Sequence, residues 1–559
     1  MLPSRRIMSR ERKERASSPW KARLERGAWV GLVLALLLVA FVRVRVREMP
    51  LERDEGEYAY AGQLLLQSVP PYQLAYNMKL PGTYIVYAII MAVFGQTASG
   101  IHLGLTLVNL AAMVLIFLLG RRLLDSVAGA VAALSYGLLS TSTALQGVCG
   151  HATHFVVLFA LGGLLLLMRA CESNRPRAFL ISGLLFGAAF LMKQPGGTFG
   201  VFALGYVLWR NWSDGKMDWP RVMQQGGALL AGLLTPLVLM CLWLWQAGVF
   251  KAFLFWTIGY ARTYVSVIPW SQLRDSLAFA GSYTLLPTLL FWLLGAAGTL
   301  IMWWEPRLSG KRLFILGWII ASILATGAGL YFRPHYFITF APVLALMCGV
   351  AVSRAAQQLL HERSVELFTA LGTQLGFIGA LIACLVTNGE AWFSQSPAEL
   401  CNRMVGSSIF SESIVVADHI RANAAPGARL AVIGSEPQIY FLSQRRSATG
   451  HIYMYGLMGV HPFARKMQDE MIREIEATKP EWIVYVQDPI SWLEQPDSDR
   501  HLLAWWENYW AANYDLVRRV GIVAAMPKAK LGPGQIADAA QAPSTGAFLI
   551  LKRKLSPAH

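Results

Sequence analysis

Acidic residues gather in the stretch RDEGEYAYAGQ, which covers residues 53–63 and directly follows the first apolar run of the chain. Carboxylates are costly at a membrane boundary unless they have a function there. Asp54 with Glu57 three residues later fits a capping box at a helix start, which leaves Glu55 unexplained. A capped helix also fixes a carboxylate in place, so capping and catalysis are compatible. One of these carboxylates could therefore act as the base of a membrane-embedded enzyme.

Three further short stretches carry groups that suit an anion. Lys79 precedes Leu-Pro-Gly, Lys193 ends the apolar run in FLMKQPGG, and YFRPHYF contains Arg333, His335 and Tyr336. A lysine at a membrane interface often only extends its ammonium group to water. Arginine, however, matches the geometry of phosphate oxygens. These groups are therefore either interfacial polar residues or parts of an anion site.

Two histidines, His151 and His154, lie in CGHATHF at the start of an apolar run. Such histidines are commonly hydrogen-bonded polar residues, but they could also contact an acceptor or bind a metal. A divalent ion would be compatible with the nearby carboxylates, although no spacing of ligands requires one. The six cysteines form no CxxC pair, which indicates buried free thiols.

The composition is that of a membrane protein. Of 559 residues, 55% are hydrophobic and 15% charged, whereas soluble proteins have about 25% charged residues. The net charge of +16 does not indicate nucleic acid, because basic residues crowd into an arm at 1–26 just before an apolar run. Such an arm holds an N-terminus in the cytoplasm and contacts anionic lipid.

Apolar runs of about 20 residues, the length that spans a bilayer, predict about eleven crossings. They lie at 27–46, 101–120, 126–144, 153–169, 178–193, 195–209, 222–246, 284–304, 312–331, 336–353 and 365–387. With the N-terminus in the cytoplasm, the short basic loops also fall on the cytoplasmic side. Residues 81–98 are apolar too, but counting them would reverse the later loops. We therefore expect one large external loop at 47–99, with interfacial helices, within a membrane domain at 27–387.

The remaining residues, 388–559, are more polar and long enough for an independent domain. Strands are expected at 429–434 and 482–486, with an amphipathic helix at 467–477 between them. A turn, GSEP, follows the first strand. This pattern predicts a small soluble α/β domain, which an odd number of crossings places on the external side. It shows no recognisable chemistry of its own.

Taken together, the expected external loops place carboxylates and cations at one membrane face. A base and an anion site suit a nucleophilic substitution with a phosphate leaving group. A transporter or flippase of a lipid-linked or anionic solute is the alternative, but transporters carry ionisable groups near the bilayer midplane. A receptor or scaffold would leave these groups without a shared purpose.

Five stretches in order resemble glycosyltransferase family 39 and its relatives in the C-type membrane glycosyltransferase (GT-C) superfamily. They are RDEGEYAYAGQ, KLPGTYIVYAIIMAVFG, GRRLLD, FLMKQPG and RPHYFITFAPVLAL, within residues 28–353. Relatives include protein O-mannosyltransferases and lipid A aminoarabinose transferases. The resemblance implies a sugar donor linked to polyprenyl phosphate, an acceptor lipid, protein or polysaccharide, and transfer at the external face of the plasma membrane.

The resemblance also implies residue roles. Asp54 matches the catalytic carboxylate, with Glu55 as its companion. Lys79 matches a basic residue before Pro-Pro-Leu, here Leu-Pro-Gly, and Lys193 matches a donor-phosphate lysine. On this basis Asp54 takes the proton of the acceptor hydroxyl, and a single displacement inverts the anomeric carbon. The leaving phosphate would contact Lys79, Lys193, Arg333, His335 and Tyr336. Relatives often carry an acid where this chain has His151 and His154.

Overall fold

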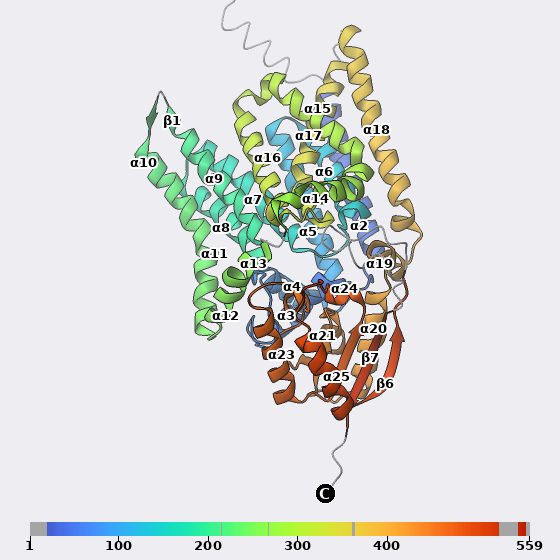
Figure 1. Cartoon of the computed structure of the whole chain (residues 1–559). Coiled ribbons are helices and arrows are strands. Elements are labelled where there is room, and N and C mark those ends of the chain that lie inside the picture. Colours follow the sequence, from blue (N-terminus) through green and yellow to red (C-terminus); the bar gives the residue numbers. More distant parts are fainter. Residues whose placement is uncertain (1–18, 214, 266–267, 360–363, 525–545, 555–559) are drawn as a thin grey trace, which may run out of the picture.

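The computed structural model describes residues 19–213, 215–265, 268–359, 364–524 and 546–554. A large helical part, blue to yellow in Figure 1, carries a smaller C-terminal domain, orange to red, at one end. Most of the basic arm expected at 1–26 lies outside the described residues. The six cysteines are all free, as predicted.

Each expected apolar run falls on a helix of its own. These helices are α2 (Pro19–Arg45), α5 (Ala98–Leu123), α6 (Ser126–Thr141), α7 (Ala152–Ser173), α8 (Pro176–Met192), α9 (Gly197–Arg210), α11 (Gly227–Gln246), α15 (Leu289–Trp304), α16 (Arg312–Gly327), α17 (Ala341–Leu359) and α18 (Ser364–Phe393). Among the described residues, seven helical stretches are long and apolar enough to cross a membrane. The chain is therefore a multi-pass membrane protein, while the total of eleven crossings stays a prediction.

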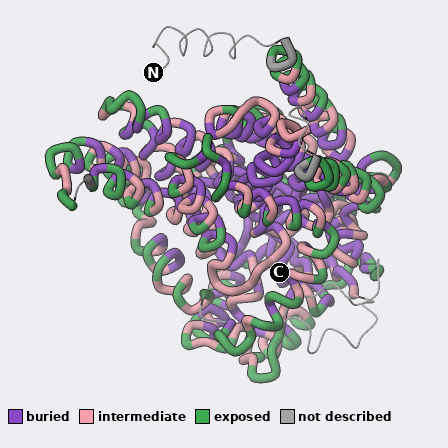
Figure 2. Tube along the Cα trace, turned by 90° about the horizontal axis from the view of Figure 1, so that it is seen from above, coloured by how far each residue is buried: buried purple, intermediate pink, exposed green. Residues whose placement is uncertain are grey.

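Glycines let these helices approach each other closely. A Cβ on Gly183 of α8 would lie 2.1 Å from the Leu229 carbonyl oxygen of α11, and one on Gly298 of α15 would lie 1.9 Å from the Met347 carbonyl oxygen of α17. Helices in lipid associate through such close packing, because apolar burial alone gives little gain there. The buried trace, purple in Figure 2, accordingly fills the interior of the helical part.

Short elements join the long helices. At the end away from the C-terminal domain lie β1 (Trp212–Ser213), β2 (Lys216–Met217) and α10 (Trp219–Arg221) (Figure 1), followed by η3 (Val222–Gly226). The exposed Trp212 and Trp219 suit a membrane–water interface. Between α11 and α15, the chain forms α12 (Phe250–Leu254), η4 (Phe255–Tyr260), α13 (Ala261–Val265), α14 (Leu273–Ala280) and η6 (Gly281–Leu285). The wider π-helical segments η4 and η6 are of a kind often found near functional sites.

The stretch expected as an external loop holds α3 (Arg53–Leu66) and α4 (Gly82–Phe94). The 13 residues of α4 extend about 20 Å at 1.5 Å per residue, too little for a hydrocarbon core of about 30 Å. The capping prediction was wrong. Glu52 is the N-cap, its carboxylate accepts from the Glu55 amide, and Glu55 completes the box. Asp54 and Glu57 are thereby left for other contacts.

The C-terminal part is an α/β domain, as predicted. Its five-stranded sheet has the order β4-β3-β5-β7-β6, with β3 (Arg429–Ile433), β4 (Arg446–Ser447), β5 (Trp482–Gln487), β6 (Tyr514–Gly521) and β7 (Ala547–Arg553). β3 pairs in parallel with β4 and β5, whereas β7 runs antiparallel to β5 and β6. Its main helices are α19 (Pro397–Val405), α20 (Ile409–Asn423), α21 (Gln438–Ser443), α23 (Ala464–Thr478), α24 (Pro489–Trp492) and α25 (His501–Asn513). The last long helix of the helical part, α18, continues to Phe393.

The α15–α17 contact provides a test of the helix packing. The substitution Gly298→Val should lower the stability by about 1–3 kcal/mol or more, because the new side chain would collide with backbone rather than with a movable side chain. The thermal midpoint of the purified protein in detergent measures this effect. Gly205→Ala is the control, since a Cβ on Gly205 meets nothing within 4 Å. Equal midpoints for the two variants would contradict the packing described here.

Candidate active site

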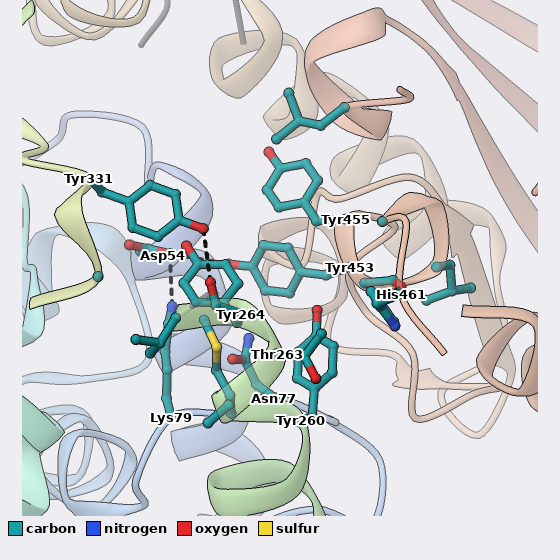
Figure 3. Close-up of a pocket in the computed structure, with 18 of the residues that line it drawn as sticks. Asp54, Asn77, Lys79, Tyr260, Thr263, Tyr264, Tyr331, Tyr453, Tyr455 and His461 are labelled. Atoms are coloured by element: carbon teal, nitrogen blue, oxygen red, sulfur yellow. Dashed lines mark hydrogen bonds and ion pairs between the residues drawn. The ribbon is translucent and has the colours of Figure 1, made fainter. Parts of the chain in front are cut away.

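A cavity of about 1820 Å³ lies where the helical part, the loop with α3 and the C-terminal domain meet. Figure 3 shows side chains from all three regions turned into it, with Tyr453 and Tyr455 entering from the C-terminal domain. Six of the residues predicted from the sequence line the cavity: Asp54, Lys79, Lys193, Arg333, His335 and Tyr336. Stretches separated by almost 300 residues in the chain therefore share one chamber.

Asp54 and Lys79 form an ion pair at the cavity wall (Figure 3). The Lys79 ammonium lies 2.8 Å from Asp54 Oδ1 and 2.5 Å from Glu57 Oε2, and it also faces the ring of Tyr58. Glu57 is fully buried and accepts a second hydrogen bond from the Tyr84 hydroxyl at 2.6 Å. Glu57 is thus a buried partner of Lys79 rather than the helix cap expected from the sequence.

The charges in this cluster shift the pKa of each carboxyl group differently. Burial alone would raise the pKa of Asp54, but Lys79 and the two nearby histidines outweigh burial and lower it. Burial raises the pKa of Glu57, and the attraction of Lys79 offsets this only in part. Asp54 therefore stays ionised at neutral pH.

Lys193 directly follows α8, and Arg333 lies before α17; both side chains line the cavity. The Lys193 ammonium stands 3.7 Å from the ring centre of Tyr336, and the Arg333 guanidinium lies over Tyr331. Within the described ranges, neither cation has a carboxylate within 4.0 Å. Burial, with the repulsion of Lys79 and Arg333, lowers the pKa of Lys193 to about 7 despite the attraction of Asp54. Lys193 and Arg333 are thus two half-buried cations in the cavity lining.

His151 and His335 lie beside Asp54. Their rings stack at a centroid distance of 3.9 Å, and His151 Nδ1 is 3.9 Å from Asp54 Oδ2. Burial lowers the pKa of His151 to about 4, so its imidazole is neutral. Neither ring nitrogen of His151 has a hydrogen-bond partner among the described residues.

These three side chains could hold a divalent metal ion. One ligand atom each from Asp54, His151 and His335 lies within 4.8 Å of the others, a donor set of two imidazoles and a carboxylate that suits zinc and similar ions. The sequence suggested His151 and His154 as possible metal ligands, whereas in the structure His335 takes the place of His154. His154 is fully buried outside the cavity lining and contacts Asn109 Oδ1 at 3.0 Å through Nδ1.

Glu55 does not reach the cavity. Its carboxylate contacts His102 Nε2 at 2.9 Å and accepts hydrogen bonds from the backbone amides of Gly150 and Glu52. The first two contacts join α3 to α5 and to the loop before α7, and the third completes the cap of α3. Glu55 therefore anchors the helix that carries Asp54. It is not placed to contact a substrate in the cavity.

The sequence analysis missed the residues that the C-terminal domain supplies. Tyr453 places its hydroxyl 3.5 Å from Asp54 Oδ1, and Tyr455 and His461 also line the cavity. Only the aromatic run HIYMY (451–455) could have drawn attention to them. Nothing in that run indicates that it lies against residue 54.

Comparisons with known proteins give matches in sequence and in fold. Residues 79–245 match the family model for dolichyl-phosphate-mannose-protein mannosyltransferase. The search of curated proteins returned no match. The fold is similar to that of ArnT from Cupriavidus metallidurans bound to undecaprenyl phosphate, with a TM-score of 0.58 and 15% identity over 94% of this chain and 98% of ArnT.

A second similar structure is the archaeal oligosaccharyltransferase AglB from Archaeoglobus fulgidus, in complex with an inhibitory peptide and a dolichol-phosphate. Its TM-score is 0.53 at 13% identity, over 82% of this chain and 69% of AglB. The chain thus matches a mannosyltransferase family model over residues 79–245, and the fold of most of its length is similar to that of these two membrane proteins.

Proposed function

We propose that this protein transfers a sugar from a polyprenyl-phosphate donor to an acceptor hydroxyl at the external face of the plasma membrane. The N-terminus would then be cytoplasmic and the C-terminal domain external. The observation that carries the proposal is the shared cavity, in which an ionised carboxylate and two cations without acidic partners face the same space. The similar structures bound to undecaprenyl phosphate and dolichol-phosphate support the donor class.

Lys193 and Arg333 would bind the donor phosphate. Both are half-buried beside aromatic rings, and a phosphate gains more from a cation in such surroundings than from one in water. Tyr336, whose ring faces Lys193, and His335 complete this wall of the cavity. Lys79 was expected to contact the phosphate, but its ammonium is already held by Asp54 and Glu57. Its role in this proposal is to neutralise these two carboxylates.

Asp54 would be the base. The acceptor oxygen attacks the anomeric carbon and loses its proton to Asp54, while the bond from that carbon to the phosphate oxygen breaks. Polyprenyl phosphate leaves with the bonding electrons and remains paired with Lys193 and Arg333. A single displacement inverts the anomeric configuration. Because its pKa is low, Asp54 would accept the proton only as the acceptor oxygen gains positive charge by forming the new bond.

A transporter or flippase fits the arrangement less well. Asp54, Lys193 and Arg333 stand at helix starts, helix ends or loops that face the C-terminal domain. Transporter sites lie instead near the middle of broken membrane helices. Incubation with a labelled undecaprenyl-phosphate sugar separates the two: an enzyme cleaves the sugar–phosphate bond, whereas a flippase moves the lipid without cleavage.

The first functional prediction concerns Asp54. Asp54→Asn should lower sugar transfer from labelled undecaprenyl-phosphate sugars to a cell-envelope extract by about 10²–10⁴-fold, because it removes the proton acceptor. Binding of undecaprenyl phosphate should change little, since Lys193 and Arg333 remain. The control Glu48→Gln removes an exposed acid next to the same loop and should transfer normally. Wild-type turnover by Asp54→Asn would refute the assignment of the base.

The second functional prediction concerns the pH dependence of donor binding. Lys193 carries its charge below a pKa of about 7 and is neutral above it, so phosphate binding at higher pH requires proton uptake. Affinity for undecaprenyl phosphate should therefore fall between pH 7 and pH 9, by up to about tenfold per pH unit. Titration in lipid nanodiscs measures it. Lys193→Arg stays charged and should flatten this dependence; an equal slope in both proteins would exclude Lys193 as its source.

A further inference from the structure

The C-terminal domain packs directly along the helix that carries Asp54. A Cβ on Gly56 of α3 would lie 2.6 Å from the Gln438 side chain at the start of α21, so only glycine permits this approach. One turn later, the rings of Tyr60 and Tyr440 stack at 5.1 Å. The Tyr60 hydroxyl also accepts a hydrogen bond from the Ser447 amide at 2.7 Å. The two helices are therefore in contact along their lengths.

A buried ion pair joins the two parts at Arg53, the residue before Asp54. The Arg53 guanidinium contacts Glu436 Oε1 at 2.6 Å and the Ser435 carbonyl oxygen at 2.5 Å. The Glu436 side chain has no exposed surface and that of Arg53 is 12% exposed. The guanidinium also lies over the rings of Phe410 and Tyr455. The Arg53 side chain, at the start of α3, is thus enclosed by residues of the C-terminal domain.

The partner of Arg53 is itself rigidly held. Glu436 belongs to the turn GSEP (434–437), and its Oε2 accepts from the Ser491 hydroxyl of α24 at 2.6 Å. Ser435 in the same turn donates its hydroxyl to the Ser491 carbonyl and its amide to the Ser491 hydroxyl. The Ser435 hydroxyl oxygen accepts from the Met454 amide. The turn is thereby tied to the HIYMY run (451–455) that lines the cavity.

That run returns to α3 through Tyr453. The Tyr453 hydroxyl donates to the Arg53 carbonyl oxygen at 3.0 Å and stands 3.5 Å from Asp54 Oδ1. The side chain of Arg53 and its carbonyl group are consequently fixed by two segments of the same network. Asp54, which follows, can move little while both contacts hold.

From this network we propose that Glu436 of the GSEP turn is a positioning residue for the reaction. It holds Arg53, and through it the first turn of α3, so that the Asp54 carboxylate faces the donor-phosphate site. This inference rests on the proposed function for the role of Asp54. It gives the C-terminal domain a task in the reaction: the domain completes the active site.

The alternative is that Glu436 merely attaches the domain. The two roles differ in what a loss of the ion pair would change. Attachment predicts lower stability or domain separation, whereas positioning predicts slower chemistry in a protein that stays assembled. A shift of about 1 Å in a reacting group can reduce a rate about 10²-fold.

The experiment compares Glu436→Gln with Glu436→Asp, which retains the charge, and with Asp418→Asn. The last variant is the control, because it removes an exposed ion-pair carboxylate of the same domain. Three measurements are made on full-length protein in nanodiscs: amide hydrogen exchange of residues 53–58, binding of undecaprenyl phosphate, and kcat and KM for sugar transfer.

Positioning predicts that Glu436→Gln exchanges at residues 53–58 at least about tenfold faster and loses about 10- to 100-fold in kcat. Undecaprenyl phosphate binding should be unchanged, Glu436→Asp should restore part of kcat, and Asp418→Asn should match the wild type. Unchanged exchange at residues 53–58, or a normal kcat, would overturn the proposal. If the wild type transferred no sugar, the proposed function would fail, while the exchange measurement would still decide whether Glu436 holds α3.

A second variant covers the case in which Glu436→Gln does not fold. Arg53→Met combined with Glu436→Met replaces the buried pair by apolar side chains, a change that proteins commonly tolerate. This double variant should stay folded, with the same faster exchange at residues 53–58 and the same loss of kcat. Wild-type values for both would overturn the proposal.

Discussion

The candidate active site depends on one interaction: a cation, Lys79, neutralises the carboxylates of Asp54 and Glu57 beside the membrane. A buried, unpaired carboxylate is too unfavourable to persist in ionised form. Lys79 removes this problem for Asp54 and Glu57 together, with its ammonium between the two. The same contact keeps Asp54 ionised and oriented towards the cavity. Without a cation at this position, α3 could not carry two acids on its buried side.

Charge is distributed unequally across the cavity. On the α3 side, Asp54 and Glu57 pair with Lys79, whereas Lys193 and Arg333 line the cavity with no carboxylate within 4.0 Å among the described residues. An aromatic ring lies beside each of these two cations. A displacement with an anionic leaving group requires such cations near a held carboxylate.

The C-terminal domain belongs to this site as much as the helices do. Figure 1 shows it against the end of the helical part that carries α3 and α4. Gly56, Arg53 and Tyr453 form the contact, and none of them would attract notice for this role in the sequence. Gly56 allows the close approach, the Arg53–Glu436 ion pair fixes the orientation of the domain, and the Tyr453 hydroxyl reaches the Asp54 carboxylate.

The sequence by itself determined the membrane class, the positions of the long helices, the α/β character of the tail and six residues of the cavity lining, among them Asp54 and Tyr336. These features follow from local patterns: apolar runs, strand and helix periodicity, and ionisable groups at the ends of apolar segments. Only the tertiary structure decided how the groups pair. Lys79 turned out to contact Glu57, His151 to stack on His335 rather than act with His154, and Glu55 to be enclosed by α5. Such pairings depend on distances between segments remote in the chain, and no local spacing contains that information.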